Sequence, residues 1–100
     1  MKRKFKNPVY VDITKYGADE SQLESLARMI GVRMSASIAR GPVTLGNCIL
    51  IDVKVEDGMT SSQIASLMRR QQTVMSNYVE AEVRRLHSRA DADVSISLFV

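Results

Sequence analysis

Cys48 and His87 are the only cysteine and the only histidine of the chain. A thiol beside an imidazole can act as a nucleophile, because the imidazole removes its proton. The strand that holds Cys48 and the helix that holds His87 are expected to run antiparallel. A strand rises about 3.3 Å per residue and a helix about 1.5 Å, so Cys48 should lie opposite roughly residues 75–79 of the helix. His87 then lies well beyond Cys48. We predict no Cys–His dyad, and these two residues cannot close a zinc site within one chain.

Asp12 and Asp52 form the second candidate, because both are expected to project from neighbouring strands onto the face of the sheet that no helix covers. Paired carboxylates can bind Mg²⁺ in phosphodiesterases and nucleases. Lys54 and Arg33 are expected on the same face and can neutralise the acids instead. We therefore expect no enzyme, no metal and no cofactor, with a metal-dependent phosphodiesterase or nuclease at this pair as the minor alternative.

The basic residues are clustered in two places. Four of the fourteen lie in the first six positions, which leaves ten against eleven acidic residues in the rest of the chain. Five arginines fall in one later segment, where Glu80 and Glu82 can pair with Arg84 and Arg85 at helical spacing. Arginine binds phosphate bidentately, so these two clusters are predicted to contact nucleic acid. The predicted contacts are Lys2, Arg3, Lys4, Lys6, Arg69, Arg70, Arg84, Arg85 and Arg89.

Hydrophobic periodicity predicts the elements that position these groups. Residues 9–16 alternate as a half-buried strand, and Asp19 with Gln22 forms a capping box that begins a helix. Residues 32–39 satisfy both the helical and the strand period, and two serines favour a strand. The stretch 41–47 has turn residues and leads into an alternating strand at 48–56. These strands are expected to form a hairpin.

The second half predicts a helix and a last strand. Thr60 and Gln63 form a capping box, the apolar stripe runs to about Arg89, and residues 94–98 alternate again. The order β-α-β-β-α-β matches a ferredoxin-like two-layer α+β sandwich, with the first and third strands as parallel neighbours in the centre. The competing order is β-α-β-α-β with one long first helix. Residues 1–7 would be a basic arm and residues 8–100 a single domain.

Two apolar surfaces are expected to be left exposed by the predicted fold and to be buried by another chain. A helix over residues 60–89 would be about 45 Å long beside strands of about 30 Å, so its end would overhang the sheet unless it bends or ends near residues 76–77. A partner subunit is the simplest cover for that end. The uncovered sheet face would add aromatic and apolar groups that favour self-association. The predicted interface residues are Tyr10, Leu50, Phe99, Val79, Val83 and Leu86.

Composition limits the function classes. A single cysteine excludes an intrachain disulfide and predicts a reducing, cytoplasmic location, and no apolar run reaches the length of a membrane span. The leading prediction is a non-catalytic homo-oligomer, with a dimer favoured, that binds nucleic acid through its arm and its arginine-bearing helix. The alternative is a protein-protein interaction module, such as an assembly component, adaptor or inhibitor. It would use the open sheet face, the overhanging helix or the last strand.

Overall fold

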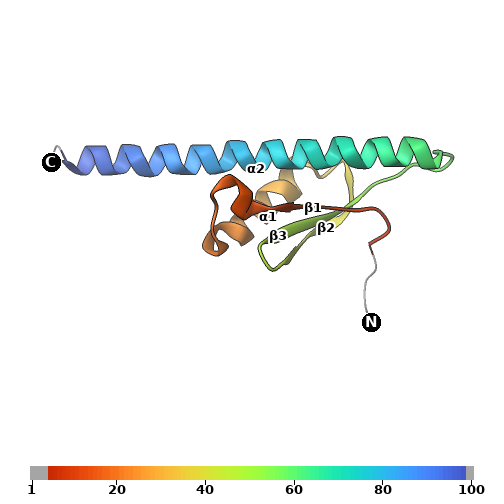
Figure 1. The fold of residues 1–100 in the computed structure, drawn as a ribbon, viewed down its shortest axis with the longest axis horizontal. Helices are drawn as coiled ribbons and strands as arrows, with labels where there is room; N and C mark the ends of the chain where they lie inside the picture. Colours follow the sequence, from red (N-terminus) through yellow and green to blue (C-terminus); the bar gives the residue numbers. More distant parts are fainter. Residues whose placement is uncertain (1–4, 99–100) are drawn as a thin grey trace.

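The computed structural model describes residues 5–98, and for residues 89–98 it describes the backbone alone. Three strands form one antiparallel sheet in the order β1-β3-β2 (Figure 1). β1 spans Pro8–Asp12, β2 spans Ile38–Leu45 and β3 spans Cys48–Val53. The central strand therefore pairs with both of the others.

Two helices cover one face of this sheet. α1 spans Leu23–Arg33 and lies over β2, whereas α2 spans Ser61–Leu98 and lies over β1. The element order is β-α-β-β-α, so the chain has an α+β fold but lacks the last strand of a ferredoxin-like sandwich in its described part. The alternative with one long first helix is also wrong, because β2 and β3 form a hairpin.

The predicted strand at residues 94–98 is wrong, because these residues continue α2 without a break. Extending an existing helix adds one hydrogen bond for each residue that is fixed, whereas a new strand must first reverse the chain. Five alternating residues are too short a signal to outweigh that difference. The alternative in which the helix bends or ends near residues 76–77 is wrong, because α2 is one continuous helix through these residues.

The first and third strands are neighbours, as predicted, but they are antiparallel rather than parallel. The crossover through α1 makes β1 parallel to β2, and the tight hairpin then reverses the chain into β3. The reversal takes only two residues, because Gly46 adopts a left-handed φ of 59°.

β1 is shorter than its alternating pattern predicts. It ends at Asp12, whose Oδ1 accepts hydrogen bonds from the Thr14 N–H at 3.0 Å and from the Thr14 hydroxyl at 2.6 Å. This side-chain turn begins a short 3₁₀ helix, η1, over Ile13–Tyr16. Ile13 is fully buried, so the apolar residue that extended the strand pattern belongs to the core in a different conformation.

The ambiguous residues 32–39 are divided between two elements. α1 continues to Arg33, and β2 begins at Ile38. Met34 follows the helical period, since it is 2% exposed and closes the apolar side of α1. Gly31 is therefore an interior helix residue, and Pro42 packs against it so closely that an added Cβ would lie 3.2 Å from the proline Cδ.

Both predicted helix starts are confirmed. The Asp19 N–H donates to Gln22 Oε1 at 3.1 Å, and a short 3₁₀ turn, η2 (Glu20–Gln22), leads into α1. At α2, the Thr60 N–H donates to Gln63 Oε1 at 2.9 Å and the Gln63 N–H donates to the Thr60 hydroxyl at 3.1 Å. Each capping box satisfies N–H groups that a helix start leaves free.

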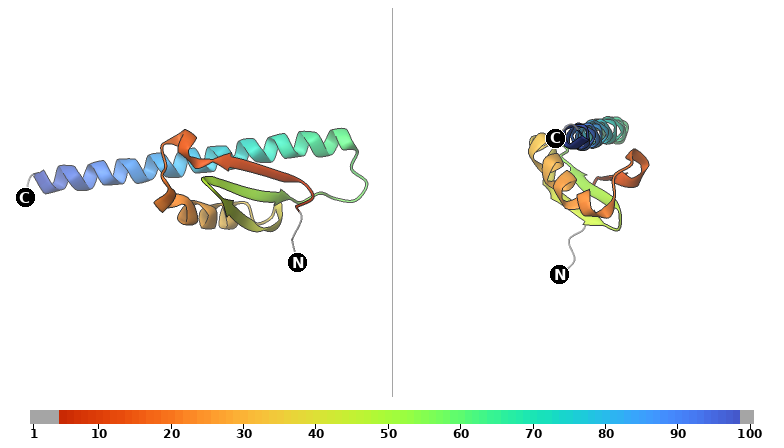
Figure 2. Two further views of the ribbon diagram at one scale, coloured as in Figure 1. Left: turned by 60° about the horizontal axis from the view of Figure 1, so that its bottom comes forward. Right: turned by 90° about the vertical axis from the view of Figure 1, so that its left-hand side faces the viewer.

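One core joins the sheet to both helices, and it reaches further along α2 than the strands do. Val79 and Val83 are 0% and 1% exposed, so the expectation that they need cover from another chain is wrong. The predicted overhang counted only the strands, whereas η1 and α1 extend the body and cover this part of α2. Leu86 is half-buried. The carboxyl-terminal part of α2 projects past the body, as the left-hand view of Figure 2 shows.

Candidate functional site

The uncovered side of the sheet is the candidate site, and its residues follow from the strand register. Residues opposite one another in antiparallel strands point to the same face, and the alternate residues face the core. Val9, Val11 and Ile51 are core residues, so their neighbours in sequence point outward. We call this surface the open face. It has three rows: Asp12, Cys48 and Leu45; Tyr10, Leu50 and Val43; Pro8, Asp52 and Arg40.

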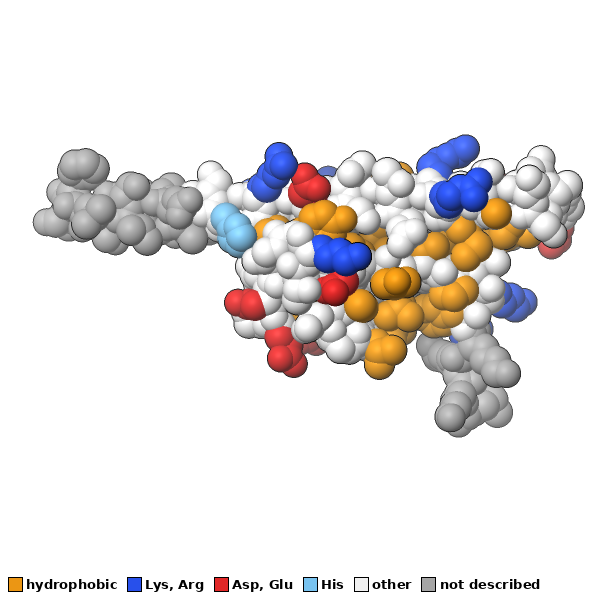
Figure 3. Space-filling view, in the orientation of Figure 1, with side chains coloured by type: hydrophobic (Ala, Val, Ile, Leu, Met, Phe, Trp, Pro, Cys, Tyr) orange, Lys and Arg blue, Asp and Glu red, His pale blue; other side chains and the backbone are white. Residues whose placement is uncertain are grey.

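Apolar side chains on the open face are exposed to solvent. Tyr10 is 56% exposed, Val43 48% and Leu45 70%, and Leu50 lies half-buried between Tyr10 and Val43. Figure 3 shows hydrophobic side chains gathered over the sheet below α2. A contiguous apolar patch on a small domain commonly marks a surface that binds another molecule.

The third row is closed by the chain that precedes β1. The Asn7 N–H donates to Asp52 Oδ1 at 2.8 Å, and Asp52 is 3% exposed. The Arg40 guanidinium lies over the Phe5 ring at 6.0 Å, a cation–π contact. Residues 5–7 of the predicted arm therefore pack on the domain and cover one end of the open face.

Arg40 is incompletely paired at this end. It lies opposite Asp52 in the sheet, yet the two form no ion pair. Its Nη1 is buried and has no hydrogen-bond partner among the described residues. A buried charged donor without a hydrogen-bond partner is costly. The Arg40 side chain as a whole is half-buried, so part of it remains open to solvent at this end of the face.

Asp12 lies at the other end of the open face and is held as an anion. Hydrogen bonds from the Thr14 hydroxyl and then from the Thr14 N–H lower the pKa of its carboxyl, and Lys15 adds a smaller effect. Its Oδ1 accepts both bonds, which fixes the carboxylate at the edge of the face. The open face thus carries an acid at one end and a base at the other.

Both edges of the sheet are protected against strand pairing. Pro8 lacks an N–H at the outer edge of β1, and Gln72 Nε2 donates to the Tyr10 carbonyl there at 3.1 Å. On the outer side of β2, the register shifts between Arg40 and Val43, and Pro42 packs on α1. Short, irregular or capped edges prevent addition of another strand. The surface left for binding is the face and not an edge.

The predicted nucleic-acid contacts are spread over the molecule. Arg84 is paired with Glu80 at 2.9 Å, and Arg85 makes two bonds to Glu82 at 2.9 and 2.8 Å. This bidentate pair lowers the pKa of Glu82 and raises that of Arg85. The side chains of Lys6, Arg69 and Arg70 are exposed. Lys2, Arg3, Lys4 and the Arg89 side chain lie outside the described residues.

The candidate chemical groups are not brought together. Asp12 lies opposite Cys48, four residues along β3 from Asp52, which puts the two acids about 14 Å apart. Two carboxylates at that distance cannot share one Mg²⁺, whose ligands lie about 2.1 Å from it. Cys48 is on the open face, whereas His87 is on α2 and approaches Gly17. No cluster of three or more metal-binding side chains occurs among the described residues.

The sequence placed some residues of the open face correctly and missed others. Tyr10 and Leu50 lie there as predicted, and Phe99 is outside the described residues. Arg33 was expected on this face, but it ends α1 and does not join it. Three residues of β2 were missed, because the predicted strand ended at residue 39 and the stretch 41–47 predicted a turn. These are Arg40, Val43 and Leu45.

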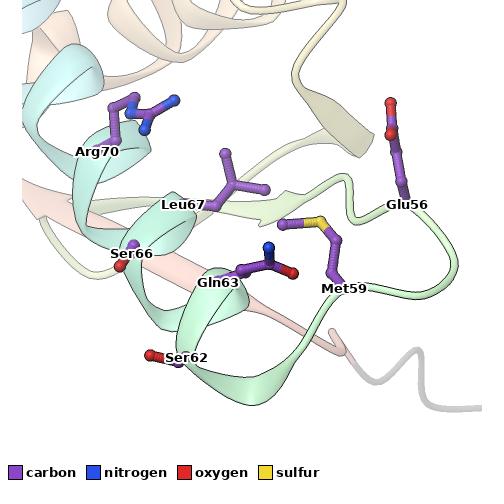
Figure 4. A pocket seen from close by; sticks show the side chains of 7 residues that line it. All are labelled: Glu56, Met59, Ser62, Gln63, Ser66, Leu67 and Arg70. Carbon is purple, nitrogen blue, oxygen red and sulfur yellow. The ribbon is translucent and has the colours of Figure 1, made fainter.

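Several hollows of similar size lie on the surface of the described residues. One hollow of about 410 Å³ lies beside the start of α2, where Figure 4 shows Met59 and Leu67 pointing toward one another. Glu56 and Arg70 also line it, together with three short polar side chains. Other hollows are of similar size, and all are open to solvent. A catalytic site is usually the dominant concave pocket with converging polar groups.

Comparisons with known proteins add no relative to this description. No protein-family model, no curated protein and no solved structure matches the chain. Among the helices in the described part of the chain, none has the length and apolarity that crossing a membrane requires. The class defined here is thus an α+β domain with one helix-covered and one open sheet face.

Proposed function

We propose that this chain is a non-catalytic protein-interaction module that binds protein on its open face. The observation that carries the proposal is the exposed apolar row of Tyr10, Leu50 and Val43 in the middle of the sheet. Burying such side chains contributes about 25 cal/mol for each Å² of apolar surface. An apolar and aromatic middle row with charges at the rim is the composition that protein interfaces favour.

The protected edges support docking by the face. A partner that added a strand would need free N–H and C=O groups along an edge, and both edges are blocked by proline, bulges or side-chain hydrogen bonds. A partner that packs side chains against the open face needs none of these groups. This favours an adaptor, inhibitor or assembly component that uses surface packing.

Site-specific photo-crosslinking in cells tests this proposal. A photoreactive phenylalanine at position 10 should form protein adducts, because the position is central to the proposed contact. The same residue at position 32 is the matched control, since Val32 is an apolar residue on α1 that is even more exposed, at 73% against 56% for Tyr10. Defined adducts from position 10 and none from position 32 are expected. Equal or absent adducts at both positions would overturn the proposal.

Nucleic-acid binding is the second candidate, and one observation favours it. Arg69, Pro8 and Tyr10 line the same surface hollow, so an exposed tyrosine and an exposed arginine lie on one part of the surface. Single strands are bound by such combinations of base stacking and phosphate contact. A dimer would present this combination twice. The predicted basic arm, residues 1–7, would add charge.

Fluorescence anisotropy with a labelled mixed-sequence RNA tests the second candidate. Charge reversal of Arg69 and Arg70 together should weaken binding and reduce its salt dependence by about one phosphate contact for each arginine. Reversal of Arg84, which is already paired with Glu80, is the matched control and should have a smaller effect. Deletion of residues 1–6 should also weaken binding. Affinity unchanged by the arginine reversals and by the deletion would exclude this candidate.

A further inference from the structure

Apart from the buried Asp52, the charges of the open face lie at diagonally opposite corners. Asp12 is in β1 in the first row, and Arg40 is in β2 in the third row. The other two corners are apolar, Leu45 and Pro8, and Leu50 is at the centre. A surface with an acid and a base on one diagonal and apolar groups on the other is complementary to itself.

We propose that the open face binds a second copy of this chain, about a two-fold axis that exchanges Asp12 of one copy with Arg40 of the other. The inference rests on the proposed function and names the partner at the same site. Two-fold dimers use the same patch on both chains, so every off-axis contact is made twice. Here both off-axis ion pairs join an acid to a base.

The arrangement of the three strands selects the direction of the axis. An axis along the strands would set Asp12 against Leu45, and an axis across them would set Asp12 against Pro8. Only an axis near the diagonal through Pro8 and Leu45 brings the two charges together. With about 6.8 Å between rows and about 4.8 Å between strands, the strands of the two sheets then cross at about 70°, nearer to the orthogonal than to the aligned arrangement. Orthogonal packing is one of the two observed ways in which sheets stack.

The remaining positions also match under this axis. Leu50 lies near the axis and packs on its own copy, and so do Leu45 and Pro8 at the two apolar corners. Cys48 of one copy faces Val43 of the other, an apolar contact made twice. Tyr10 of one copy faces the third row of the other copy, at the end of the open face that residues 5–7 cover. No like charges oppose one another among these pairs.

Arg40 forms no ion pair among the described residues, because the adjacent Asp52 instead accepts from the Asn7 N–H. Its side chain is half-buried, so a carboxylate from a second copy would meet the part that is exposed. The cation–π contact with Phe5 holds the side chain at this corner.

Charge exchange with the full chain tests the proposal. Sedimentation or light scattering should give the wild type a mass of two 11.2 kDa chains. Asp12→Arg and Arg40→Asp should each weaken the dimer by about tenfold or more, because like charges then oppose one another twice. The double variant should recover most of the affinity. Arg28→Asp changes the same charge on α1 and is the control that should leave the dimer intact.

A second measurement covers the case in which Arg40→Asp, next to the buried Asp52, does not fold. Val43→Cys places a second thiol where the proposed axis brings Cys48 of the other copy. Oxidised glutathione should then link two chains through a disulfide between Cys48 and the thiol introduced at position 43, identified by peptide mapping. Thr44→Cys is the control, because Thr44 pairs with the core residue Ile49 and so lies on the opposite face. It should give no such link.

The outcomes separate this inference from the proposed function. A dimer that the single reversals weaken and the double variant restores supports the inference, as does the disulfide between positions 43 and 48 of two chains. A purified chain that is monomeric, or a dimer indifferent to the reversals with no such disulfide, overturns it. Adducts from position 10 to a different protein would then leave the proposed function standing. A monomer without adducts would contradict both.

Discussion

The two faces of the sheet differ in composition and in what they pack against. The covered face is built from β-branched residues, such as Val9, Ile49 and Ile51, each 6% exposed or less. The open face mixes Tyr10, two aspartates and an arginine with smaller apolar groups. Branched aliphatic side chains fill an interior with few rotamers to lose. A mixed face keeps the domain folded without a permanent partner, yet leaves apolar area for one.

The comparison can be tested first by truncating equivalent side chains on neighbouring residues of β3. Ile51→Ala should lower the free energy of unfolding by about 2–5 kcal/mol, because it leaves a cavity in a closed core. Leu50→Ala should cost the isolated chain about 1 kcal/mol or less, since that side chain is half-buried. Urea denaturation at low protein concentration measures both. Equal losses in the free energy of unfolding would show that Leu50 is as closely packed as Ile51, which contradicts an uncovered face.

Asp52 is the exception on the open face, because it is buried. Asp52→Ala removes the acceptor of the Asn7 N–H and should cost about 1–3 kcal/mol in urea denaturation. Asp57→Ala changes the same residue type at an exposed position and should stay within about 0.5 kcal/mol of the wild type. If both variants unfold at the wild-type urea concentration, residues 5–7 do not hold this end of the face.

A substitution at the contact between α1 and β2 should change the free energy of unfolding less, because helix propensity and steric crowding there oppose each other. Gly31→Ala gains about 0.5–1 kcal/mol of helix propensity, but its Cβ would lie 3.2 Å from Pro42 Cδ. We expect the two terms nearly to cancel in the wild type. In a Pro42→Ala background the ring is gone, so Gly31→Ala should become stabilising. A double-mutant cycle measures this coupling, and additive effects would contradict the packing described.

The smallest effect concerns the acid corner of the open face. The Thr14 hydroxyl lowers the pKa of Asp12, so Thr14→Val should move that pKa back toward its ordinary value. A carboxyl whose pKa is lower in the folded chain than in the unfolded chain stabilises the fold at neutral pH. This stabilisation is lost as the pH falls through the folded value. Stability of the wild type and of Thr14→Val should therefore converge in acid. NMR titration of the Asp12 carboxyl measures the shift, and an unchanged pKa would contradict it.

Local signals in the sequence predicted local structure well. The two capping boxes, at Asp19 and Thr60, specify helix starts through hydrogen bonds between residues three apart, and both are present. The alternation of β3 also identified its buried residues, because a strand with one covered face has a period of two. These features depend on neighbours in the chain alone.

The errors came from competition between local patterns and tertiary structure. Residues 41–45 contain glycine and proline and predict a turn, but pairing with β3 and packing on Gly31 hold them in β2. As a result, the residues that β2 contributes to the open face could not be predicted. The last alternating residues, 94–98, followed the helix that preceded them. The predicted strand direction was wrong, because direction depends on the hairpin and not on any single segment.

The mass of the Leu50→Lys variant beside that of the wild type tests the central claim most directly. Leu50 lies at the centre of the open face, and a lysine there would set two charges against one another near the proposed axis. The account predicts a wild-type dimer and a folded Leu50→Lys monomer, with folding checked by circular dichroism. A Leu50→Lys variant that remains dimeric, or a wild type that is a monomer, would contradict it.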